Sequence, residues 1–387
     1  MHFELSPEQA ELQETITDFA QAEIAPVAEE LDRKGEFPVE LFRRVGEMGV
    51  MSIPFPEERG GMGLGVFEAT LAIEALARAD QSIAVSTMVS MATGLTVERF
   101  GSDTQKQQWL PEIVSGQKIC SIAGTEPGAG SDTGGFTTRA TQLGNGQWSL
   151  SGEKAFITNA GTPISLFTLV LAISSPKEAE RKKFSLFLTP NNAPGYTRGK
   201  GYNKMGWRSS DTRQLYLDDC QLGEDAIVGE LHGGRHLLHK GYQAARLWLA
   251  ACSLGLAQAS LDHAIAYAQE RHVFGGSLGK RQLIQQMIAQ MALKVDTARL
   301  LTYRAAWQID NGVEDLGALS MAKLGATEIG TEVANMAVQV HGGWGYMDDC
   351  PPSRYLRDNR ICTIGDGSSE IQTMLIARAC GLDVDFT

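Results

Sequence analysis

Hydrophobic residues in the first third of the chain recur at the three-to-four-residue spacing of helices. A serine, a first-turn proline and a glutamine at residues 6–9 form the pattern of a capped helix start, and apolar residues follow at helical spacing. The same spacing returns over residues 39–51 and 67–100, on either side of a stretch rich in proline and glycine. Residues 1–118 are therefore predicted to form an all-helical domain.

From about residue 119 the pattern changes to short runs of β-branched and aromatic residues separated by turns, which is typical of strands. This predicts a middle β domain over residues 119–232. The predicted strands are 148–150, 155–158, 166–173, 184–188 and 214–217.

After a pair of glycines at 233–234, helical spacing resumes for the rest of the chain, so residues 233–387 are predicted to form a helical bundle. The order of helices, strands and helices predicts an α+β fold. It excludes doubly wound sheets and α/β barrels, in which strands and helices alternate. The long predicted helices are 237–271, 283–311 and 316–339.

Composition limits the classes of partner. The chain has 387 residues, of which 43% are hydrophobic, and this length suggests two or three structural units. With 34 basic against 46 acidic residues the net charge is -12, and no basic run favours binding to nucleic acid. The first 30 residues match neither a signal peptide nor a transit peptide, and no apolar run is long enough for a membrane span. We expect a cytoplasmic protein.

The six cysteines are widely spaced and include no Cys-x-x-Cys pair, which favours reduced, mostly buried thiols. His341 has no histidine or cysteine at ligand spacing. The sequence therefore predicts no metal site.

Asp366 is the first candidate for chemistry, because it lies between Gly365 and Gly367 just before a predicted helix that Ser368 would start. Flanking glycines permit backbone conformations that are closed to other residues, so a carboxylate can be presented to a ligand as a base. The same three residues also occur in ordinary surface turns.

Three further segments have the residues of a site for a flat ligand. Small residues at 125–132 allow a planar ligand to approach backbone N–H groups, but Thr133 stands where a dinucleotide fingerprint needs its third glycine. Residues 156–161 combine an aromatic ring, a hydroxyl and a glycine, and residues 339–345 interrupt a helix with three glycines. Taken singly, each is also compatible with a turn or an element end.

Taken together and in this order, these segments resemble the acyl-CoA dehydrogenase family of flavoproteins from end to end. The family's fold has a helical N-terminal domain, a middle β-barrel or β-sandwich domain and a C-terminal four-helix bundle. The motifs that carry the resemblance are Thr125–Asp132, Lys154–Asn159, Arg208–Thr212, Glu270–Gly275 with Gln282, Gln339–Gly343 and the Asp366 turn.

The resemblance implies that FAD binds between the β domain and the bundle, with the acyl-CoA thioester against the flavin. It also implies a homotetramer and reoxidation by an electron-transfer flavoprotein or a similar acceptor. By position the resemblance assigns Gly124, Thr125, Gly130 and Ser131 to the flavin ring and pantetheine, and Phe156 and Thr158 to the flavin. It assigns to the adenine-pyrophosphate half of FAD Arg271, Phe274 and Gln282 of one subunit and Gln339, Gly342 and Gly343 of a neighbouring subunit. It assigns Ser368 and Glu370 to further FAD contacts and Arg246 to the CoA chain.

The family's chemistry is removal of an α-proton by a carboxylate and of a β-hydride by flavin N5, and the resemblance makes Asp366 the base. Most members have glutamate there, within Tyr-Glu-Gly-Thr, so this base is one methylene shorter. The alternative base position of some members is Ala245 here. A shorter base requires a substrate that is closer or bulkier at its α-carbon, and Gly365 and Gly367 leave space for one. The expected apolar pocket wall is Ala84, Val85, Met88 and Met91.

We therefore expect dehydrogenation of an α-branched or alicyclic acyl-CoA, similar to members acting on cyclohexanecarboxyl-CoA. Three alternatives remain open. They are a short- or medium-chain acyl-CoA dehydrogenase, a relative performing enoyl-CoA reduction or elimination, and a catalytically silent flavin-binding subunit.

Overall fold

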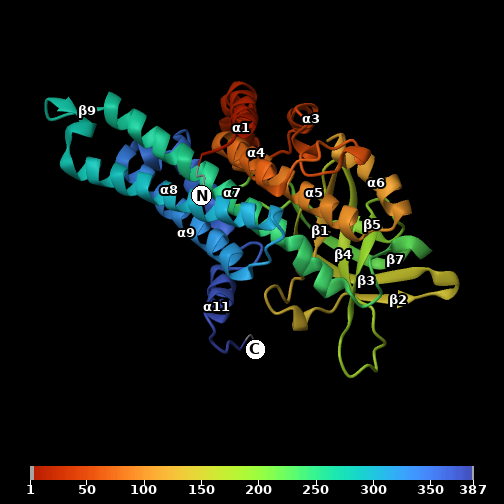
Figure 1. The fold of residues 1–387 in the computed structure, drawn as a ribbon. Helices are drawn as coiled ribbons and strands as arrows, with labels where there is room; N and C mark the ends of the chain where they lie inside the picture. The colour runs from red at the N-terminus through yellow and green to blue at the C-terminus, as the bar shows by residue number, and fades with distance from the viewer. Residues whose placement is uncertain (1–3, 386–387) are drawn as a thin grey trace.

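Residues 4–385 are described by the computed structural model, in which a long helical bundle and a β-sheet meet beneath the N-terminal helices (Figure 1). In this view the bundle extends to the left and the sheet lies to the right. The N-terminal helices are α1 (Pro7–Phe19), α2 (Ala28–Lys34), α3 (Val39–Glu47), α4 (Val66–Ala79), α5 (Gln81–Phe100) and α6 (Asp103–Val114).

Helix α1 begins as the sequence predicts. The Ser6 hydroxyl accepts a hydrogen bond from the Gln9 N–H, and the Gln9 side chain accepts one from the Ser6 N–H. The predicted helical run over 67–100 is instead two helices, α4 and α5. Asp80 separates them with extended backbone, and its carboxylate caps α5 by accepting from the Ile83 N–H at 2.9 Å. Because both helices are mostly buried, the apolar pattern runs across the break without marking it.

Eight strands of the described residues form one sheet, in the order β6-β7-β3-β2-β4-β5-β8, with β1 paired in parallel to β4. Most neighbouring strands are antiparallel; β2 also pairs with β4 in parallel, at one residue. The strands are β1 (Ile119–Ala123), β2 (Arg139–Gln142), β3 (Trp148–Thr158), β4 (Ser165–Ile173), β5 (Phe184–Pro190), β6 (Tyr196–Arg198), β7 (Thr212–Leu222) and β8 (Ile227–Val228).

The two strands predicted at 148–150 and 155–158 are parts of the single strand β3. Its pairing with β7 shifts register between Leu150 and Gly152 and again between Lys154 and Ile157. Gly152 has φ 145°, and a Cβ there would lie 2.7 Å from the Thr138 Cα. The irregular register explains why the residues between the two runs do not follow the alternating pattern of a strand.

The C-terminal helices pack mainly around α7, which contacts α4, α5, α8 and α9. With 37 residues, α7 is about 55 Å long. A Cβ at Gly255 would lie 2.2 Å from the Glu74 carbonyl oxygen, so this glycine allows α7 to touch α4. The elements are α7 (Gly234–Glu270), the hairpin β9 (His272–Val273) and β10 (Gly276–Ser277), α8 (Gln282–Asp310), α9 (Leu316–His341), α10 (Pro351–Asn359) and α11 (Ser369–Ala379).

Polar contacts join the three parts of the chain at one buried junction. Arg357 of α10 pairs with Asp32 of α2 at 2.6 Å. The backbone N–H of Trp207 donates to the Asp358 carboxylate at 2.6 Å. The indole N–H of Trp207 donates to the Gln81 side chain at 2.7 Å. We call this set of residues the three-domain junction. It fixes the relative positions of the helices and the sheet that surround the site described next.

Candidate active site

Asp366 lies in a strained turn, residues 365–367, between a short 3₁₀ helix (Arg360–Thr363) and α11. Its backbone is left-handed, with φ 52°, and Gly367 follows with φ 94°. For a residue with a Cβ this conformation costs on the order of 1 kcal/mol or more, so the surroundings must hold it. We refer to residues 365–367 as the Asp366 turn.

Side chains from three helices hold the carbonyl oxygens of this turn. Arg246 Nε of α7 donates to the Asp366 carbonyl at 3.2 Å. Lys323 Nζ of α9 donates to the Gly367 carbonyl at 2.8 Å, and Gln372 Nε2 of α11 donates to the same oxygen at 3.1 Å. These bonds fix the backbone of the turn and leave the carboxylate uncommitted.

Within residues 4–385, no hydrogen bond or ion pair reaches the Asp366 carboxylate. Burial raises the pKa of this carboxyl above its ordinary value, while the charges of Lys323 and Arg246 oppose the shift. An unpaired carboxylate with a raised pKa is suited to accept a proton from a ligand.

A cavity beside Asp366 is lined by α5, β1 and α7. Its Thr93 and Thr96 hydroxyls donate to carbonyls of their own helix, at 2.7 and 2.8 Å. Burial raises the pKa of the Tyr242 phenol well above its ordinary value, so this group stays neutral at physiological pH. Such a lining suits a mostly apolar ligand group. The lining residues are Val89, Ala92, Thr93, Thr96, Ile122, Gly241, Tyr242, Ala245 and Asp366.

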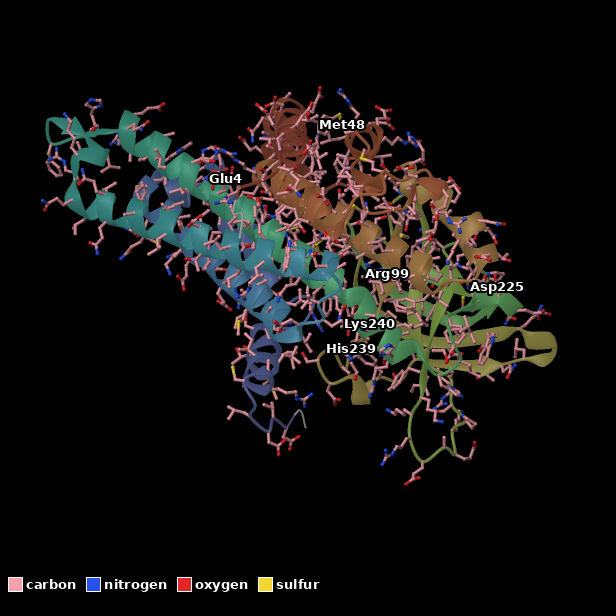
Figure 2. All side chains as sticks on the ribbon, viewed as in Figure 1. Glu4, Met48, Arg99, Asp225, His239 and Lys240 are labelled. Carbon is pink, nitrogen blue, oxygen red and sulfur yellow. The ribbon has the colours of Figure 1, made fainter. Side chains whose placement is uncertain are left out.

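The α7 segment around His239 and Lys240 lies beside the end of α5 that Arg99 marks (Figure 2). This close approach depends on a glycine, because a Cβ at Gly241 would lie 2.5 Å from the Thr96 hydroxyl. The absence of a side chain at this position brings α5 and α7 together along one edge of the cavity.

The expected pocket wall lies on a neighbouring face of α5. Ala84, Val85, Met88 and Met91 are fully buried in the main core, and none of them lines the cavity beside Asp366. Met88 Sδ instead lies 3.8 Å from Cys252 Sγ. Helix α5 is buried on nearly all sides, so its sequence carries no apolar stripe that would mark the face toward the cavity.

The loop of residues 124–132 is fixed by a closed buried ion pair. Lys154 Nζ donates to Glu126 Oε1 at 2.9 Å and to the Gly124 carbonyl at 3.0 Å, and both charged side chains are inaccessible or nearly so. Thr137 and Thr138 give the same carboxylate three more hydrogen bonds of 2.7 to 2.9 Å. Burial opposes ionisation of both partners. Even so, Lys154 and the threonines lower the pKa of Glu126 to about 2, while burial lowers that of Lys154 to about 8.

The predicted flavin residues of this loop differ in exposure. Gly124 is buried and Thr125 half-buried, whereas Gly130 and Ser131 are exposed. The loop reaches β3 through a hydrogen bond from the Ala155 N–H to the Thr125 carbonyl at 2.9 Å. The backbone of the loop is therefore fixed close to the end of β3.

At that end of β3, Phe156 has φ 61° and its side chain is 64% exposed, while Thr158 is half-buried. The Phe156 ring lies 5.2 Å from the ring of Tyr202. Asn159, which follows, donates to the Ser86 carbonyl of α5 at 2.8 Å. An exposed aromatic ring in a strained conformation suits stacking on a flat ligand.

Arg271, Phe274 and Gln282 lie at the tip of the bundle, around the β9–β10 hairpin, far from the sheet (Figure 1). Phe274 is 95% exposed with φ 48°. At the end of α9, His341 stacks on Tyr267 of α7 with 4.3 Å between ring centroids. The exposed residues Gln339, Gly342 and Gly343 therefore lie at the same end of the bundle. Within one chain the tip residues are not brought to Phe156 and Thr158.

Ser368 and Glu370 begin α11 directly after the Asp366 turn. Ser368 occupies the capping position, although its side chain makes no capping hydrogen bond, and Glu370 is exposed. A Cβ at Gly128, Gly342 or Gly343 would meet nothing within 4 Å. Open glycines, an exposed ring at Phe156 and fixed backbone N–H groups fit a large flat cofactor with a phosphate-bearing tail.

Three features of the site escaped the sequence analysis. Tyr242 lines the cavity, Lys323 holds the Asp366 turn, and Glu126 forms its ion pair with Lys154. Glu126 and Lys154 both belong to motifs named in the sequence analysis. They are 28 residues apart, however, and nothing in the sequence indicates that their side chains form an ion pair. Lys323 is a lone lysine in a helix that is otherwise mainly apolar on its buried side. This is the feature of the sequence that could have indicated a role for Lys323.

The part of the chain that the structure describes contains no cluster of three or more side chains able to hold a metal ion. All six cysteines are free thiols, five of them buried. Over residues 4–385, every helix is too short or too polar to cross a membrane.

Comparisons with known proteins cover the whole of this architecture. Three family models match: acyl-CoA dehydrogenase, N-terminal domain, over residues 6–117, middle domain over 121–220, and C-terminal domain over 232–381. The short-chain specific acyl-CoA dehydrogenase of Rattus norvegicus mitochondria is 40% identical over 367 residues, which are 95% of this chain and 88% of that protein.

Among solved structures, butyryl-CoA dehydrogenase from Megasphaera elsdenii has a TM-score of 0.95 and 31% identity, covering 99% of this chain and 100% of that one. A glutaryl-CoA dehydrogenase from Mycobacterium smegmatis, solved in complex with FADH2, has a TM-score of 0.93 and 26% identity, covering 99% and 97%.

Proposed function

The chain belongs to the acyl-CoA dehydrogenase family of FAD-dependent enzymes, and we propose that Asp366 is the base that removes the α-proton of its acyl-CoA substrate. The observation that carries this proposal is the state of Asp366. Its carboxylate has no partner among the described residues, and Asp366 lines a mostly apolar cavity. Side chains of three helices hold the backbone of its turn.

The reaction needs two groups at adjacent carbons. Bound FAD supplies the acceptor for the hydride of the β-carbon. The Asp366 carboxylate takes the α-proton, and the apolar cavity side chains Val89, Ala92 and Ile122 exclude water from that position. Proton removal next to a thioester also requires fixed donors at the developing oxyanion, and backbone N–H groups of a rigid turn provide such donors.

We assign FAD to the surfaces that the fold leaves open. The flavin ring would contact Thr125, Phe156 and Thr158, between the 124–132 loop and the end of β3. Its phosphate-bearing tail would reach the exposed tip of a bundle. Because the tip of the same chain lies far from Phe156, this tip would come from a neighbouring subunit (Figure 1). The residues proposed for the tail are Arg271, Phe274, Gln282, Gln339, Gly342 and Gly343. Further contacts with FAD are proposed for Gly124, Gly130, Ser131, Ser368 and Glu370. Contacts with the thioester are proposed for Ser131, Arg246, Gly365 and Gly367.

For the substrate we propose an acyl group that is branched or cyclic at the α-carbon. Aspartate has one methylene less than glutamate, so the α-carbon must lie closer to the turn. Space for it exists at Gly365, where an added Cβ would meet only the Ile361 carbonyl oxygen, at 3.6 Å. Val89, Ala92 and Ala245 offer apolar contacts to a ring in the adjoining cavity.

A short straight-chain acyl group is the second candidate. It is favoured by the names of two similar proteins, which describe a short-chain specific acyl-CoA dehydrogenase and a butyryl-CoA dehydrogenase. The two candidates differ in what they require at the α-carbon, so a panel of thioesters separates them.

The deciding experiment is anaerobic bleaching of the flavin by cyclohexanecarboxyl-CoA, isobutyryl-CoA, butyryl-CoA and octanoyl-CoA in parallel. We expect the cyclic or branched thioesters to bleach the flavin fastest. Faster bleaching by butyryl-CoA would select the second candidate. If no thioester bleaches the flavin, the chain is instead a reductase, an elimination enzyme or a silent flavin-binding subunit.

Two variants test the base itself. Asp366→Asn should keep the flavin spectrum and lose at least about a thousandfold in reduction rate, because it retains the size of the side chain without a basic oxygen. Asp366→Glu should shift preference toward straight chains. Asp349→Asn, at an exposed position, is the matched control and should behave as the unmodified protein. Bleaching of Asp366→Asn at the normal rate would remove Asp366 from the mechanism.

We also propose a homotetramer, because α8 exposes a stripe of large apolar side chains at seven-residue spacing. Leu293, Leu300 and Trp307 are 69%, 48% and 58% exposed. Repeats of seven place side chains on one face of a helix, and an exposed apolar stripe of this length marks an interface. Leu293→Glu should therefore yield smaller species in sedimentation analysis, whereas Lys177→Glu, in the exposed turn between β4 and β5, should not. An unchanged mass for Leu293→Glu would contradict the interface.

For the electron acceptor we propose an electron-transfer flavoprotein, as the family membership suggests. The reduced enzyme should then reduce added electron-transfer flavoprotein under anaerobic conditions, and lack of transfer would exclude this partner. A cytoplasmic setting agrees with the free thiols, and cell fractionation tests it.

A further inference from the structure

Lys323 is a fully buried cation without an ion-pair partner within the described residues. Its ammonium donates to the Gly367 carbonyl at 2.8 Å. Burying a charge that is not paired is expensive by several kcal/mol, so a buried lysine in this state requires a compensating charge nearby. Lys323 lies against the Asp366 turn, which carries a carboxylate.

The acidic group in the Asp366 turn is Asp366, next to the carbonyl that Lys323 binds. Burial lowers the pKa of Lys323, and the charges of Asp366, Cys362 and Glu328 oppose that shift while Arg246 adds to it. Of the acidic groups, Asp366 has the largest effect. The groups that face Asp366 from the surrounding elements are Lys323 of α9, Arg246, Tyr242 and Cys252 of α7, and Cys362 of the 3₁₀ helix.

Arg246 and Lys323 contact the turn in the same way, through backbone carbonyls and not through the carboxylate. A direct ion pair would occupy the oxygens that must accept a proton. A cation bonded to the next carbonyl leaves those oxygens free and still places positive charge close to them. Lys323 is inaccessible to solvent, so water screens its charge less than it would at the surface.

We propose that Lys323 is a positioning residue for the base: its ammonium fixes the Asp366 turn through the Gly367 carbonyl and places a buried positive charge beside the Asp366 carboxylate. This inference rests on the proposed function of Asp366. It assigns to Lys323 two separable tasks, a hydrogen bond to the turn and a charge, and substitutions separate them.

The test compares three variants of the holoenzyme. Lys323→Gln keeps a donor and loses the charge, Lys323→Arg keeps the charge, and Gln372→Met removes the uncharged donor to the same carbonyl. The rate of flavin bleaching is measured against pH with the best thioester of the panel. Lys294→Met, at a lysine that pairs with Glu332 between α8 and α9, is the control.

Loss of a nearby positive charge raises the pKa of a carboxyl, so the acid limb of the bleaching rate should move to higher pH. For Lys323→Gln we expect a shift of about one pH unit and at least a tenfold lower rate below the limb. Lys323→Arg should keep the limb in place. Gln372→Met should slow bleaching without moving the limb.

A second readout does not depend on turnover. The infrared C=O band of protonated Asp366, identified by its loss in Asp366→Asn, should titrate at higher pH in Lys323→Gln than in the unmodified protein. Equal titration in the two proteins, or the same limb shift in Gln372→Met, would overturn the inference. Full bleaching activity in Asp366→Asn would instead overturn the proposed function, so the two failures are distinguishable.

Discussion

Two irregular segments of the site hold their carboxylates in opposite ways. In the 124–132 loop, Glu126 is fully committed: Lys154 and two threonines occupy its oxygens with four hydrogen bonds of 2.7 to 2.9 Å. In the Asp366 turn, the donors bind backbone carbonyls, and no described residue bonds to the carboxylate. Both turns need a fixed backbone next to the ligand, but only one needs a reactive side chain.

The difference shows how a rigid loop can be separated from a reactive group. A carboxylate with four hydrogen bonds and a buried lysine stays ionised and unreactive, as the lowered pKa of Glu126 indicates. A carboxylate whose turn is held by other atoms keeps both oxygens available for a proton. Burial then raises its pKa, which makes it a better acceptor near neutral pH.

The largest effect should follow from breaking the closed pair. Lys154→Met leaves Glu126 buried without its cation, and removing one partner of a buried pair typically destabilises a protein by about 3 to 5 kcal/mol. Because Lys154 also holds the Gly124 carbonyl, FAD should be released at lower temperature. Thermal unfolding and the rise of free flavin fluorescence measure both effects.

Two further variants sharpen this prediction. The double variant Glu126→Gln with Lys154→Met should recover at least half of the lost stability, because no charge is then left unpaired. Asp366→Asn should change stability by less than about 1 kcal/mol, since no hydrogen bond to the carboxylate is lost. If Asp366→Asn destabilises the protein as much as Lys154→Met, the contrast between the two carboxylates is wrong.

The sequence predicted the Asp366 turn better than the buried ion pair of Glu126 and Lys154 that fixes the 124–132 loop. The reason is physical. Glycines on both sides of an aspartate mark a local backbone requirement that short-range sequence reveals. The pair of Glu126 and Lys154 depends on the register of β3 against the loop, which the sequence does not specify. The helical and strand regions followed from periodicity, so most of the fold was accessible.

Periodicity failed where burial is uniform. Helix α5 is apolar on nearly all sides, so neither the break at Asp80 nor the face toward the cavity could be predicted. The expected wall at Met88 therefore lies on a neighbouring face of the helix from Val89 and Ala92, which line the cavity. The residues proposed for the bundle tip depend on a neighbouring chain, and one sequence contains no information on its placement.

Asp358, in the three-domain junction, is intermediate between the two carboxylates of the site. Its carboxylate accepts a hydrogen bond from the Trp207 N–H at 2.6 Å, and charges of both signs surround it. Burial, together with the like charge of Asp80, raises its pKa to about 7, against the opposing effect of Arg354. A partly satisfied buried carboxylate with a raised pKa should thus make stability depend on pH.

The sign of this dependence follows from linkage. The pKa of Asp358 is higher in the folded than in the unfolded chain, so its contribution to stability is complete below about pH 4 and is lost as pH rises through 7. Between pH 4.5 and 8 the loss is on the order of 3 kcal/mol. Asp358→Asn keeps an acceptor for the Trp207 N–H and removes the ionisable group, so its stability should decline less over this range. Urea unfolding at both pH values measures the difference, with Asp349→Asn as an exposed control. If Asp358→Asn and the unmodified protein change in parallel, Asp358 is ionised in the folded protein, and the ordering of the three carboxylates by their bonds must be abandoned.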